Sequence, residues 1–474
     1  MQPTSARFHD NVDKALRDSD LQTALHRVDK NFTSRRTAAV TAMPEFEALR
    51  DEAVQIKNHT LDHLDLYLEK FEENVTAAGG QVHWAATPED ARQIILDLCQ
   101  AAGTRTVTKG KSMIAEEVAL NPFLEEHGIT PVETDLGEYI IQLADEPPSH
   151  IIGPAIHKTK EQVSDLFVTH HAKLGKTERL TEGEDLVAEA RDVLRPRYLE
   201  ADVGITGANF LIAETGTSVI VTNEGNGDLT QQLPRTHIVI ASLEKVVPTL
   251  EDASTILRVL ARSATGQQMS VYTTFSTGPR RANDPDGPDA FHVVLLDNGR
   301  SKLLGSEFQD ILRCIRCGAC FNHCPVYASI GGHAYGWVYS GPMGAVLTPT
   351  MIGIDQAHHL PNATPFCGRC EAVCPMRIPL PKMMRHWRAQ AFDKKLDAVR
   401  QRLALRAWAW LARRPALYRR LSGLAVRYLA WRGRPLGRLR DLPFAEGWTA
   451  SRDLPAPQGR TFSAQWAQRR RGNT

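Results

Sequence analysis

The sequence has no apolar run that approaches the roughly 20 uncharged residues of a membrane-spanning helix. Its first residues, MQPTSARFHDN, include no apolar segment of the kind that a secretory signal requires. We therefore expect a cytoplasmic protein. A complete phosphate-binding loop and a complete dinucleotide fingerprint are also absent, which argues against hydride transfer from a nicotinamide cofactor bound to this chain.

Acidic residues are scarce toward the C-terminus. From Met376 onward there are 23 Lys and Arg but 5 Asp and Glu, whereas the 474-residue chain carries a formal net charge of only +1. The preceding part is therefore acidic overall. Such an asymmetry indicates that the C-terminal region docks on an acidic partner.

Cysteine is almost absent outside one short window. The chain has eight cysteines, and seven of them fall between Cys314 and Cys374 at spacings of two and three residues. These spacings suit metal ligation better than a disulfide framework. The eighth, Cys99, lies in the apolar stretch ARQIILDLCQ, where we expect a buried core thiol.

The first cysteine group follows the pattern C-x2-C-x2-C-x3-C-P, in which one loop places three thiolates at corners of an iron-sulfur cubane. Its members are Cys314, Cys317, Cys320 and Cys324, followed by Pro325. The fourth cysteine of such a run ligates a second cluster, which requires a second motif. That motif consists of Cys367, Cys370 and Cys374, followed by Pro375.

This crossed pattern predicts two iron-sulfur clusters of the 4Fe-4S kind. The ligands predicted for the first cluster are Cys314, Cys317, Cys320 and Cys374. Those predicted for the second cluster are Cys324, Cys367 and Cys370. A zinc site is the alternative, since C-x2-C pairs also hold zinc. Seven ligands in two crossed groups, with a proline after each terminal cysteine, favour iron and sulfide.

The second cluster is one thiolate short. Thr364 stands where the full repeat has a cysteine, and a neutral hydroxyl is a poor ligand for iron. The second centre is therefore either a 3Fe-4S cluster or a 4Fe-4S cluster with an open corner. An open corner either binds substrate or water or only adjusts the reduction potential, and we favour the adjustment of potential.

Four regions are predicted along the chain. Residues 1–75 form a helical lead-in, and residues 76–300 alternate β-rich and helical stretches, which is typical of an α/β domain with a largely parallel sheet. Residues 301–385 form a small ferredoxin-like two-cluster domain held by metal. Residues 386–474 form a basic helical tail. Strands are expected at 81–85, 104–110, 203–206, 217–222, 236–242 and 291–297, and helices at 87–103 and 249–264.

With these motifs in place, the chain resembles the lactate utilisation protein B family, the iron-sulfur subunit of the bacterial L-lactate oxidation system. The resemblance covers nearly the whole length. The α/β part carries it in TGANFLIAETGTSVIVTNEGNG (206–227) and LPRTHIVIASLEKVVPTL (233–250). It continues in the cysteine segments 314–349 and 366–380 and in GWTASRDLP (447–455).

The resemblance implies an α/β fold like that of CoA transferases and sugar-phosphate isomerases, and three-ligand binding of the second cluster as a family trait. It also implies companion subunits of a lactate-oxidising complex, one of them cysteine-rich. We therefore expect an electron-transfer subunit rather than the substrate site. The alternatives are that this chain itself is the catalytic oxidoreductase, or that it is a redox-responsive binding or regulatory module.

Some polar residues of the α/β region are candidates for anion binding or catalysis. Thr206, Gly207, Ala208 and Asn209 follow a predicted strand, where a turn either presents N–H groups to an anion or is simply tight. Glu214 and Glu224 resemble the glutamate nucleophile of CoA transferases, although a hydrogen bond to loop backbone is the favoured interpretation.

Four cations are further candidates to converge on a carboxylate substrate. They are Lys109, Lys111, His150 and His157, and we favour structural roles for them.

The arginine-rich helices from Arg377 to Arg440 have three interpretations. Docking to a partner subunit is favoured. Peripheral contact with an anionic membrane surface is the second, since Trp408, Trp410 and Trp431 stand beside arginines. Nucleic-acid binding is disfavoured, because the rest of the chain is acidic and no nucleic-acid-binding motif is present.

Overall fold

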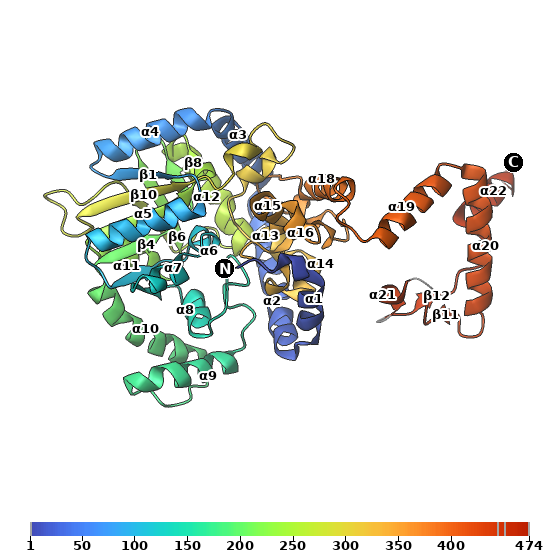
Figure 1. Ribbon diagram of the computed structural model, residues 1–474, viewed down its shortest axis with the longest axis horizontal. Coiled ribbons are helices and arrows are strands. Elements are labelled where there is room, and N and C mark those ends of the chain that lie inside the picture. Colours follow the sequence, from blue (N-terminus) through green and yellow to red (C-terminus); the bar gives the residue numbers. More distant parts are fainter. Residues whose placement is uncertain (1, 443–444, 450–451, 473–474) are drawn as a thin grey trace. The chain divides into compact units, whose positions relative to one another are not determined.

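The computed structural model describes residues 2–442, 445–449 and 452–472 (Figure 1). The chain divides into two compact units, Met1–Ala391 and Phe392–Thr474. Positions 450–451 of the C-terminal segment GWTASRDLP lie outside the described residues.

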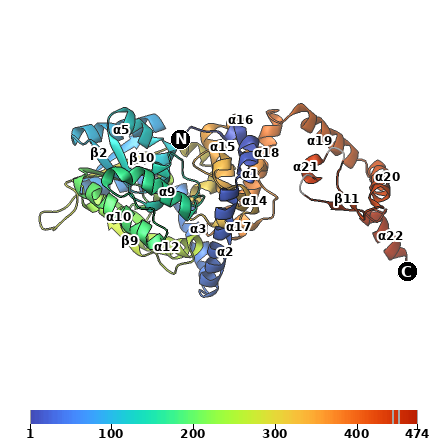
Figure 2. The ribbon, with the colours of Figure 1, turned by 90° about the horizontal axis from the view of Figure 1, so that it is seen from below.

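The N-terminal region is helical, as predicted from its periodicity. Its helices are α1 (Phe8–Arg17), α2 (Ser19–Thr41), α3 (Phe46–Asp62) and α4 (Leu64–Ala77). Asp18 caps α2, because its side chain accepts hydrogen bonds from the N–H groups of Asp20 and Leu21. Helices α1 and α2 pack beside the cysteine-containing region in both views (Figures 1 and 2).

A six-stranded sheet forms the centre of the first unit, and every neighbouring pair of its strands is parallel. The strand order is β1-β10-β7-β4-β2-β3. The strands are β1 (Gln81–Ala85), β2 (Thr106–Lys109), β3 (Thr130–Glu133), β4 (Val203–Thr206), β7 (Thr236–Ser242) and β10 (Ala290–Leu296). The prediction of an α/β domain with a largely parallel sheet is confirmed.

Both faces of this sheet are covered, and the residues of its inner strands β4, β7 and β10 are therefore almost all buried. On β7, Ile238 and Ile240 face a core that contains α5 (Pro88–Ala101). Val239 and Ala241 face the opposite core, which contains α4. Successive side chains of a strand point to opposite faces, so one strand contributes to two cores.

A second, four-stranded sheet of order β8-β5-β6-β9 lies on the α4 side of the central sheet's core. Its strands are β5 (Phe210–Ile212), β6 (Thr217–Thr222), β8 (Val246–Val247) and β9 (Tyr272–Ser276). Strand 217–222 was predicted, whereas β5, β8 and β9 were not. In this sheet β6 runs antiparallel to both of its neighbours.

Helices and short helical turns connect the strands of the α/β region. They are α6 (Met113–Glu117), α7 (Leu120–Glu126), α8 (Leu136–Leu143), α9 (Lys160–His171), η2 (Ala172–Leu174), α10 (Gly183–Glu200), α11 (Asn226–Gln232), η3 (Leu243–Lys245) and α12 (Leu250–Ala264). The predicted helices at 87–103 and 249–264 correspond to α5 and α12. Each begins with a capping box, in which a threonine and an aspartate three residues later bond reciprocally to backbone N–H groups.

The cysteine-containing region is built from short helices. They are η4 (Ser301–Leu303), η5 (Gln309–Arg313), α13 (Ala319–Asn322), α14 (Pro325–Ile330), η6 (His333–Tyr335), α15 (Gly341–Ile352), α16 (Ile354–Ala357), η7 (Leu360–Asn362), α17 (Arg369–Ala372) and α18 (Leu380–Asp393). Gly332 shows how closely this region approaches the α/β region, since a Cβ there would lie 1.7 Å from the carbonyl oxygen of Ser149.

The second unit is mostly helical. Its elements are α19 (Val399–Ala412), α20 (Pro415–Gly433), β11 (Arg438–Leu439), α21 (Glu446–Thr449), β12 (Leu454–Pro455) and α22 (Phe462–Gly472). Trp408, Trp410 and Trp431 are exposed. Among the described residues, no helix is both long enough and apolar enough to cross a membrane.

Candidate metal centre

Four of the seven clustered cysteines line one small cavity. They are Cys314, Cys317, Cys320 and Cys374, the set assigned to the first cluster from the sequence. Most of the other lining side chains are apolar, among them Ile151, Phe321, Met343 and Leu380. Burial, and then the neighbouring thiols of Cys374 and Cys314, raise the pKa of the Cys317 thiol. The fold therefore brings these thiols together in an apolar enclosure.

The other three cysteines form a second group. Burial, and then the nearby Cys324 and Cys367 thiols, raise the pKa of Cys370 to about 12. Cys324 and Cys370 are buried and Cys367 is exposed. This second group therefore lies nearer the protein surface than the first.

The spacing of the sulfur atoms bears on the choice between iron-sulfur clusters and zinc. Among the described residues, no three cysteine sulfurs lie within 4.8 Å of one another. Zn–S bonds of about 2.3 Å in tetrahedral geometry place thiolates about 3.8 Å apart. The cysteines are thus spaced more widely than a single zinc ion requires, and all of them are free of disulfides. The chemistry of this donor set fits iron-sulfur clusters.

The two cysteine motifs share one local backbone conformation. Arg316 and Phe366 have positive φ values of 58° and 54°, and each directly precedes a cysteine. The next residue after that cysteine is a glycine in the left-handed region, Gly318 or Gly368, which begins a four-residue helix. Only glycine adopts this conformation without strain, so the Cys-Gly pairs of the sequence reflect the geometry of the loop.

Backbone N–H groups are directed at several of the sulfur atoms. Cys324 accepts from the N–H groups of Val326 and Tyr327. Cys374 accepts from the N–H groups of Met376 and Ile378. Both sets lie just beyond the Cys-Pro pairs. Hydrogen bonds to sulfur stabilise the thiolate form and tune the potential of a bound cluster.

Thr364 already makes hydrogen bonds within its own loop. Its hydroxyl oxygen accepts from the N–H of Phe366 at 3.0 Å, and its own N–H donates to the carbonyl of Asn362 at 2.8 Å. The hydroxyl is therefore positioned by the turn that leads into Cys367.

Two arginines of the N-terminal helices contact the loop of the second cysteine motif. Arg36 of α2 donates to the carbonyl of Val373 at 2.9 Å, and Arg50 of α3 donates to the carbonyl of Cys374 at 2.6 Å. The helical lead-in thus supports this loop and places positive charge near thiolates.

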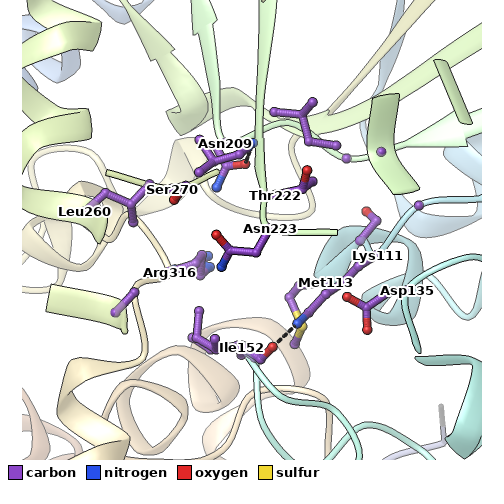
Figure 3. A pocket seen from close by; sticks show the side chains of 18 of the residues that line it. Lys111, Met113, Asp135, Ile152, Asn209, Thr222, Asn223, Leu260, Ser270 and Arg316 are labelled. Carbon is purple, nitrogen blue, oxygen red and sulfur yellow. Dashed lines mark hydrogen bonds between the residues drawn. The ribbon is translucent and has the colours of Figure 1, made fainter. Parts of the chain in front are cut away.

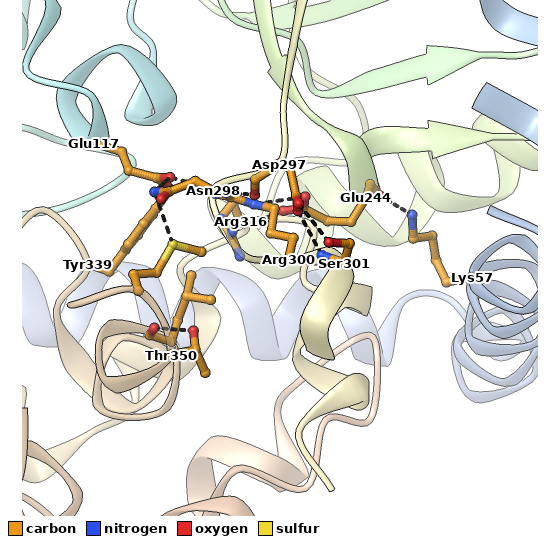
Figure 4. Close-up of polar contacts among 12 residues, drawn as sticks. Lys57, Glu117, Glu244, Asp297, Asn298, Arg300, Ser301, Arg316, Tyr339 and Thr350 are labelled. Atoms are coloured by element: carbon orange, nitrogen blue, oxygen red, sulfur yellow. Dashed lines mark hydrogen bonds and ion pairs between the residues drawn. The ribbon is translucent and has the colours of Figure 1, made fainter. Parts of the chain in front are cut away.

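A buried ionic network joins the α/β region to the first cysteine motif (Figure 4). Arg300 makes a bidentate pair with Glu117, with N–O distances of 2.9 and 2.7 Å, and lies 3.0 Å from Glu244. Glu244 in turn lies 3.3 Å from Arg316, which stands between Cys314 and Cys317. Tyr339 also donates to Glu117. Burial alone raises the pKa of Glu244, but Arg300 and then Arg316 outweigh it and lower the pKa to about 2.

All four predicted side chains have hydrogen-bond or ion-pair partners in the fold, and that of Lys111 is the carbonyl of Ile152. Lys109 is fully buried and pairs with Glu133 at 2.7 Å and Glu116 at 3.0 Å. His150 bonds to Asn322. His157 bonds to Ser149 and pairs with Glu146. Only Lys111 lines a large cavity at the carboxyl ends of β2 and β4.

Most residues of the predicted turn after β4 line the same cavity. Gly207, Ala208 and Asn209 line it, whereas the Thr206 hydroxyl bonds to His237. Glu224 also lines it and accepts from the N–H of Leu136, while Glu214 accepts from the N–H of Leu250. Both glutamates bond to backbone N–H groups, as favoured from the sequence, but these groups belong to the first residues of α8 and α12 and not to loops.

Sequence reasoning missed two cations of this cavity, Lys245 and Arg316. The sequence did offer one indication of a functional role for Arg316, namely its position inside a cysteine motif. Cys99 is buried in the core beside α5, as expected, and burial raises its pKa to about 12.

These features define an iron-sulfur protein in which a cysteine-rich region is joined to an α/β domain. Three family models match the chain: LUD domain over residues 68–296, 4Fe-4S dicluster domain over residues 310–378, and Lactate utilisation protein B, C-terminal, over residues 391–471.

Curated relatives match the chain over all or most of its length. Lactate utilization protein B of Lysinibacillus sphaericus is 41% identical over 479 residues, covering 100% of this chain and 99% of the relative. The protein of the same name from Geobacillus kaustophilus is 45% identical and covers 92% of each chain. The chain therefore belongs to the lactate utilization protein B family.

A solved structure, that of a DUF162 family protein from Deinococcus radiodurans, also overlaps the chain. The overlap covers 49% of this chain and 98% of the other at 16% identity, with a TM-score of 0.26. An overlap of this quality is too low to establish a shared fold.

Proposed function

We propose that this chain is the iron-sulfur electron-transfer subunit of a cytoplasmic complex that oxidises L-lactate to pyruvate. Bound clusters supply one-electron chemistry, which ordinary side chains do not provide. The observation that carries the proposal is the grouping of four cysteines around one apolar cavity in a chain whose full-length relatives are named for lactate utilization.

The proposed ligands of the first cluster are Cys314, Cys317, Cys320 and Cys374, and those of the second are Cys324, Cys367 and Cys370. The second cluster is either of the 3Fe-4S kind or of the 4Fe-4S kind with an open corner beside Thr364. A Thr364→Cys variant tests this assignment, because a fourth thiolate completes the ligation of a 4Fe-4S cluster and allows a 3Fe-4S cluster to take up a fourth iron from added ferrous ion. We expect an altered electron paramagnetic resonance signal of the second cluster and an unchanged first cluster.

Partners of this chain are proposed to be companion subunits of the lactate-oxidising complex, one of them cysteine-rich. The basic second unit is the proposed docking surface, since α19 and α20 carry many arginines and no acidic residue. Exposed Trp408, Trp410 and Trp431 also suit peripheral contact with an anionic membrane. Salt-dependent binding to the companions, and not to anionic vesicles, would favour the subunit interface.

The proposed organisation retains the four regions 1–75, 76–300, 301–385 and 386–474. The α/β region is proposed to have the fold of CoA transferases and sugar-phosphate isomerases, and the cysteine region a ferredoxin-like one. Fold analogy of this kind carries no assignment of catalytic residues.

A second candidate function is that this chain is itself the catalytic oxidoreductase. The observation that favours it is the large cavity at the strand ends, which shares Arg316 with the first cysteine group. In this case the companions only remove electrons.

Electron paramagnetic resonance of the anaerobically purified chain separates these candidates. Under the first proposal, L-lactate reduces the clusters only when the proteins encoded by neighbouring genes are added. Reduction by lactate with the purified chain alone would establish the catalytic alternative. Clusters that dithionite reduces but lactate never does, with or without those proteins, would refute both.

A further inference from the structure

A cavity of about 240 Å³ lies at the carboxyl ends of the parallel strands β2 and β4 (Figure 3). Its lining includes three cations, Lys111, Lys245 and Arg316, and two carboxylates, Asp135 and Glu224. Ligands of α/β proteins commonly bind at this edge of the sheet, where the loops after the strands converge. The titratable side chains of the lining therefore carry a surplus of one positive charge, which suits a monoanion.

Arg316 is held rigidly but is only partly satisfied. Its side chain is 9% exposed, and one guanidinium nitrogen, Nη2, lies 3.3 Å from Glu244. Its guanidinium carbon lies 5.1 Å from the ring centroid of Tyr339. Nη1 and Nε are buried without a hydrogen-bond partner among the described residues. Leaving such donors unpaired is costly, so a partner from outside the chain is expected, either the sulfur of the first cluster or an anion in the cavity.

Lys245 is the second cation whose charge is only partly compensated. The residue is 7% exposed, and the carboxylate that attracts its ammonium group, that of Glu244, already pairs with Arg300 and Arg316. Burial, and then the charge of Arg316, lower its pKa to about 8. A bound anion would compensate both positive charges. Lys111, by contrast, already donates to the carbonyl of Ile152.

Neutral polar groups complete the wall of the cavity. Asn209, Asn223, Thr222 and Ser270 surround the same opening as Lys111 and Arg316 (Figure 3). Amides and hydroxyls of this kind bond to a hydroxyl or carbonyl oxygen of a ligand. The lining therefore suits a small acid that carries an oxygen substituent beside its carboxylate.

The cavity adjoins the first cysteine group. Arg316 and Ile151 line both the cavity and the small enclosure formed by Cys314, Cys317, Cys320 and Cys374. Single residues thus separate the two spaces, and a ligand that bonds to Arg316 contacts the loop between Cys314 and Cys317.

We propose that this cavity binds a small monoanionic 2-hydroxy or 2-oxo carboxylic acid, with its carboxylate held by Arg316 and Lys245. The choice of acid rests on the proposed function, whereas the anion site rests on the incompletely paired cations. Occupancy of the site changes the surroundings of the first cluster through Arg316.

The test uses the full chain, purified anaerobically with its clusters, and calorimetric titration with pyruvate, L-lactate, acetate and inorganic phosphate. We expect pyruvate or L-lactate to bind at least tenfold more tightly than acetate or phosphate. We expect Lys245→Met to weaken that binding at least tenfold, and Lys302→Met, which removes an exposed lysine elsewhere, to leave it unchanged. Pyruvate is also expected to shift the resonance spectrum of the reduced wild-type protein.

Asn223→Leu provides a second variant that should weaken binding of the acid. Asn223 is exposed, so its replacement by leucine narrows the cavity and leaves the packing of the protein core unchanged. Iron content and circular dichroism show whether each variant is folded and loaded. Tighter binding of phosphate, absence of acid binding to fully loaded protein, or binding that neither variant weakens would each overturn the proposal. Acid binding without lactate-driven reduction, even when the proteins encoded by neighbouring genes are added, would leave the site intact and refute only the electron-transfer function.

Discussion

Replacement of Arg300 by leucine removes the centre of the buried network between the α/β region and the first cysteine motif. Arg300 is 1% exposed, and its removal strips the bidentate partner from Glu117 and the nearer of two arginines from Glu244. Both carboxylates remain almost completely buried. A buried charge that loses its partner is the main source of the expected destabilisation.

The expected loss is about 3 to 5 kcal/mol in the free energy of unfolding, the usual cost of breaking a buried ion pair from one side. Tyr339 and Asn298 still donate to Glu117, and Arg316 still faces Glu244, which favours the lower end of this range. An exposed pair serves as the matched control. Arg280→Leu breaks a pair with Asp289 in which both side chains are about half exposed, and it should cost less than about 1 kcal/mol.

The effect of Arg300→Leu on stability should depend on pH, because Arg300 sets the pKa of the buried carboxylate of Glu117. Burial raises the pKa of Glu117, but Arg300 outweighs burial and lowers it below the ordinary value. The contribution of this lowered pKa to stability is therefore present above the unfolded pKa and lost as the pH falls through the folded one. Without Arg300, burial raises the pKa of Glu117, and protonation of the folded variant relieves part of the cost.

Urea denaturation under anaerobic conditions measures this effect. The deficit of Arg300→Leu relative to wild type should be smaller at pH 5.5 than at pH 8, while that of Arg280→Leu stays small at both. A deficit for Arg300→Leu no larger than that of the control, or one that does not change with pH, would refute the reasoning.

Two further substitutions test the packing and the metal assignment. Gly204→Ala places a Cβ 1.8 Å from the carbonyl oxygen of Thr230 and should destabilise by about 1 to 3 kcal/mol, whereas Gly183→Ala meets no atom within 4 Å and should be tolerated, as thermal unfolding would show. Cys320→Ala should lower the bound iron, whereas Cys99→Ala, in the core, should retain it; equal iron in both variants would contradict the ligand assignment.

Most of the central sheet was predictable because its inner strands are buried on both faces. THIVIAS and FHVVLLD each contain four consecutive apolar residues, IVIA and VVLL, and the helix α12 between them has clear periodicity. β5 was missed because it has three residues, and β3 because Pro131 interrupts it. Such short strands form because they pair with neighbouring strands, and this pairing cannot be predicted from a local sequence pattern.

The iron-sulfur ligands were also predictable from the sequence, because a cubane requires a fixed spacing of the cysteines within one loop. The two cations Lys245 and Arg316 of the cavity could not be predicted in this way. Lys245 follows β7, and Arg316 belongs to a different motif, so their approach depends on how the cysteine region packs on the sheet. Lys109 was a candidate for substrate binding, but it is paired inside the protein. Its partners Glu116 and Glu133 come close to it only in the folded chain, so the sequence did not reveal the pairing.

The most direct test of the account is an iron and sulfide count on the anaerobically purified chain, followed by electron paramagnetic resonance of its oxidised and reduced forms. Two clusters predict about eight irons with two interacting 4Fe-4S signals, or about seven with a 3Fe-4S signal in the oxidised protein. Bound zinc without sulfide would contradict the account.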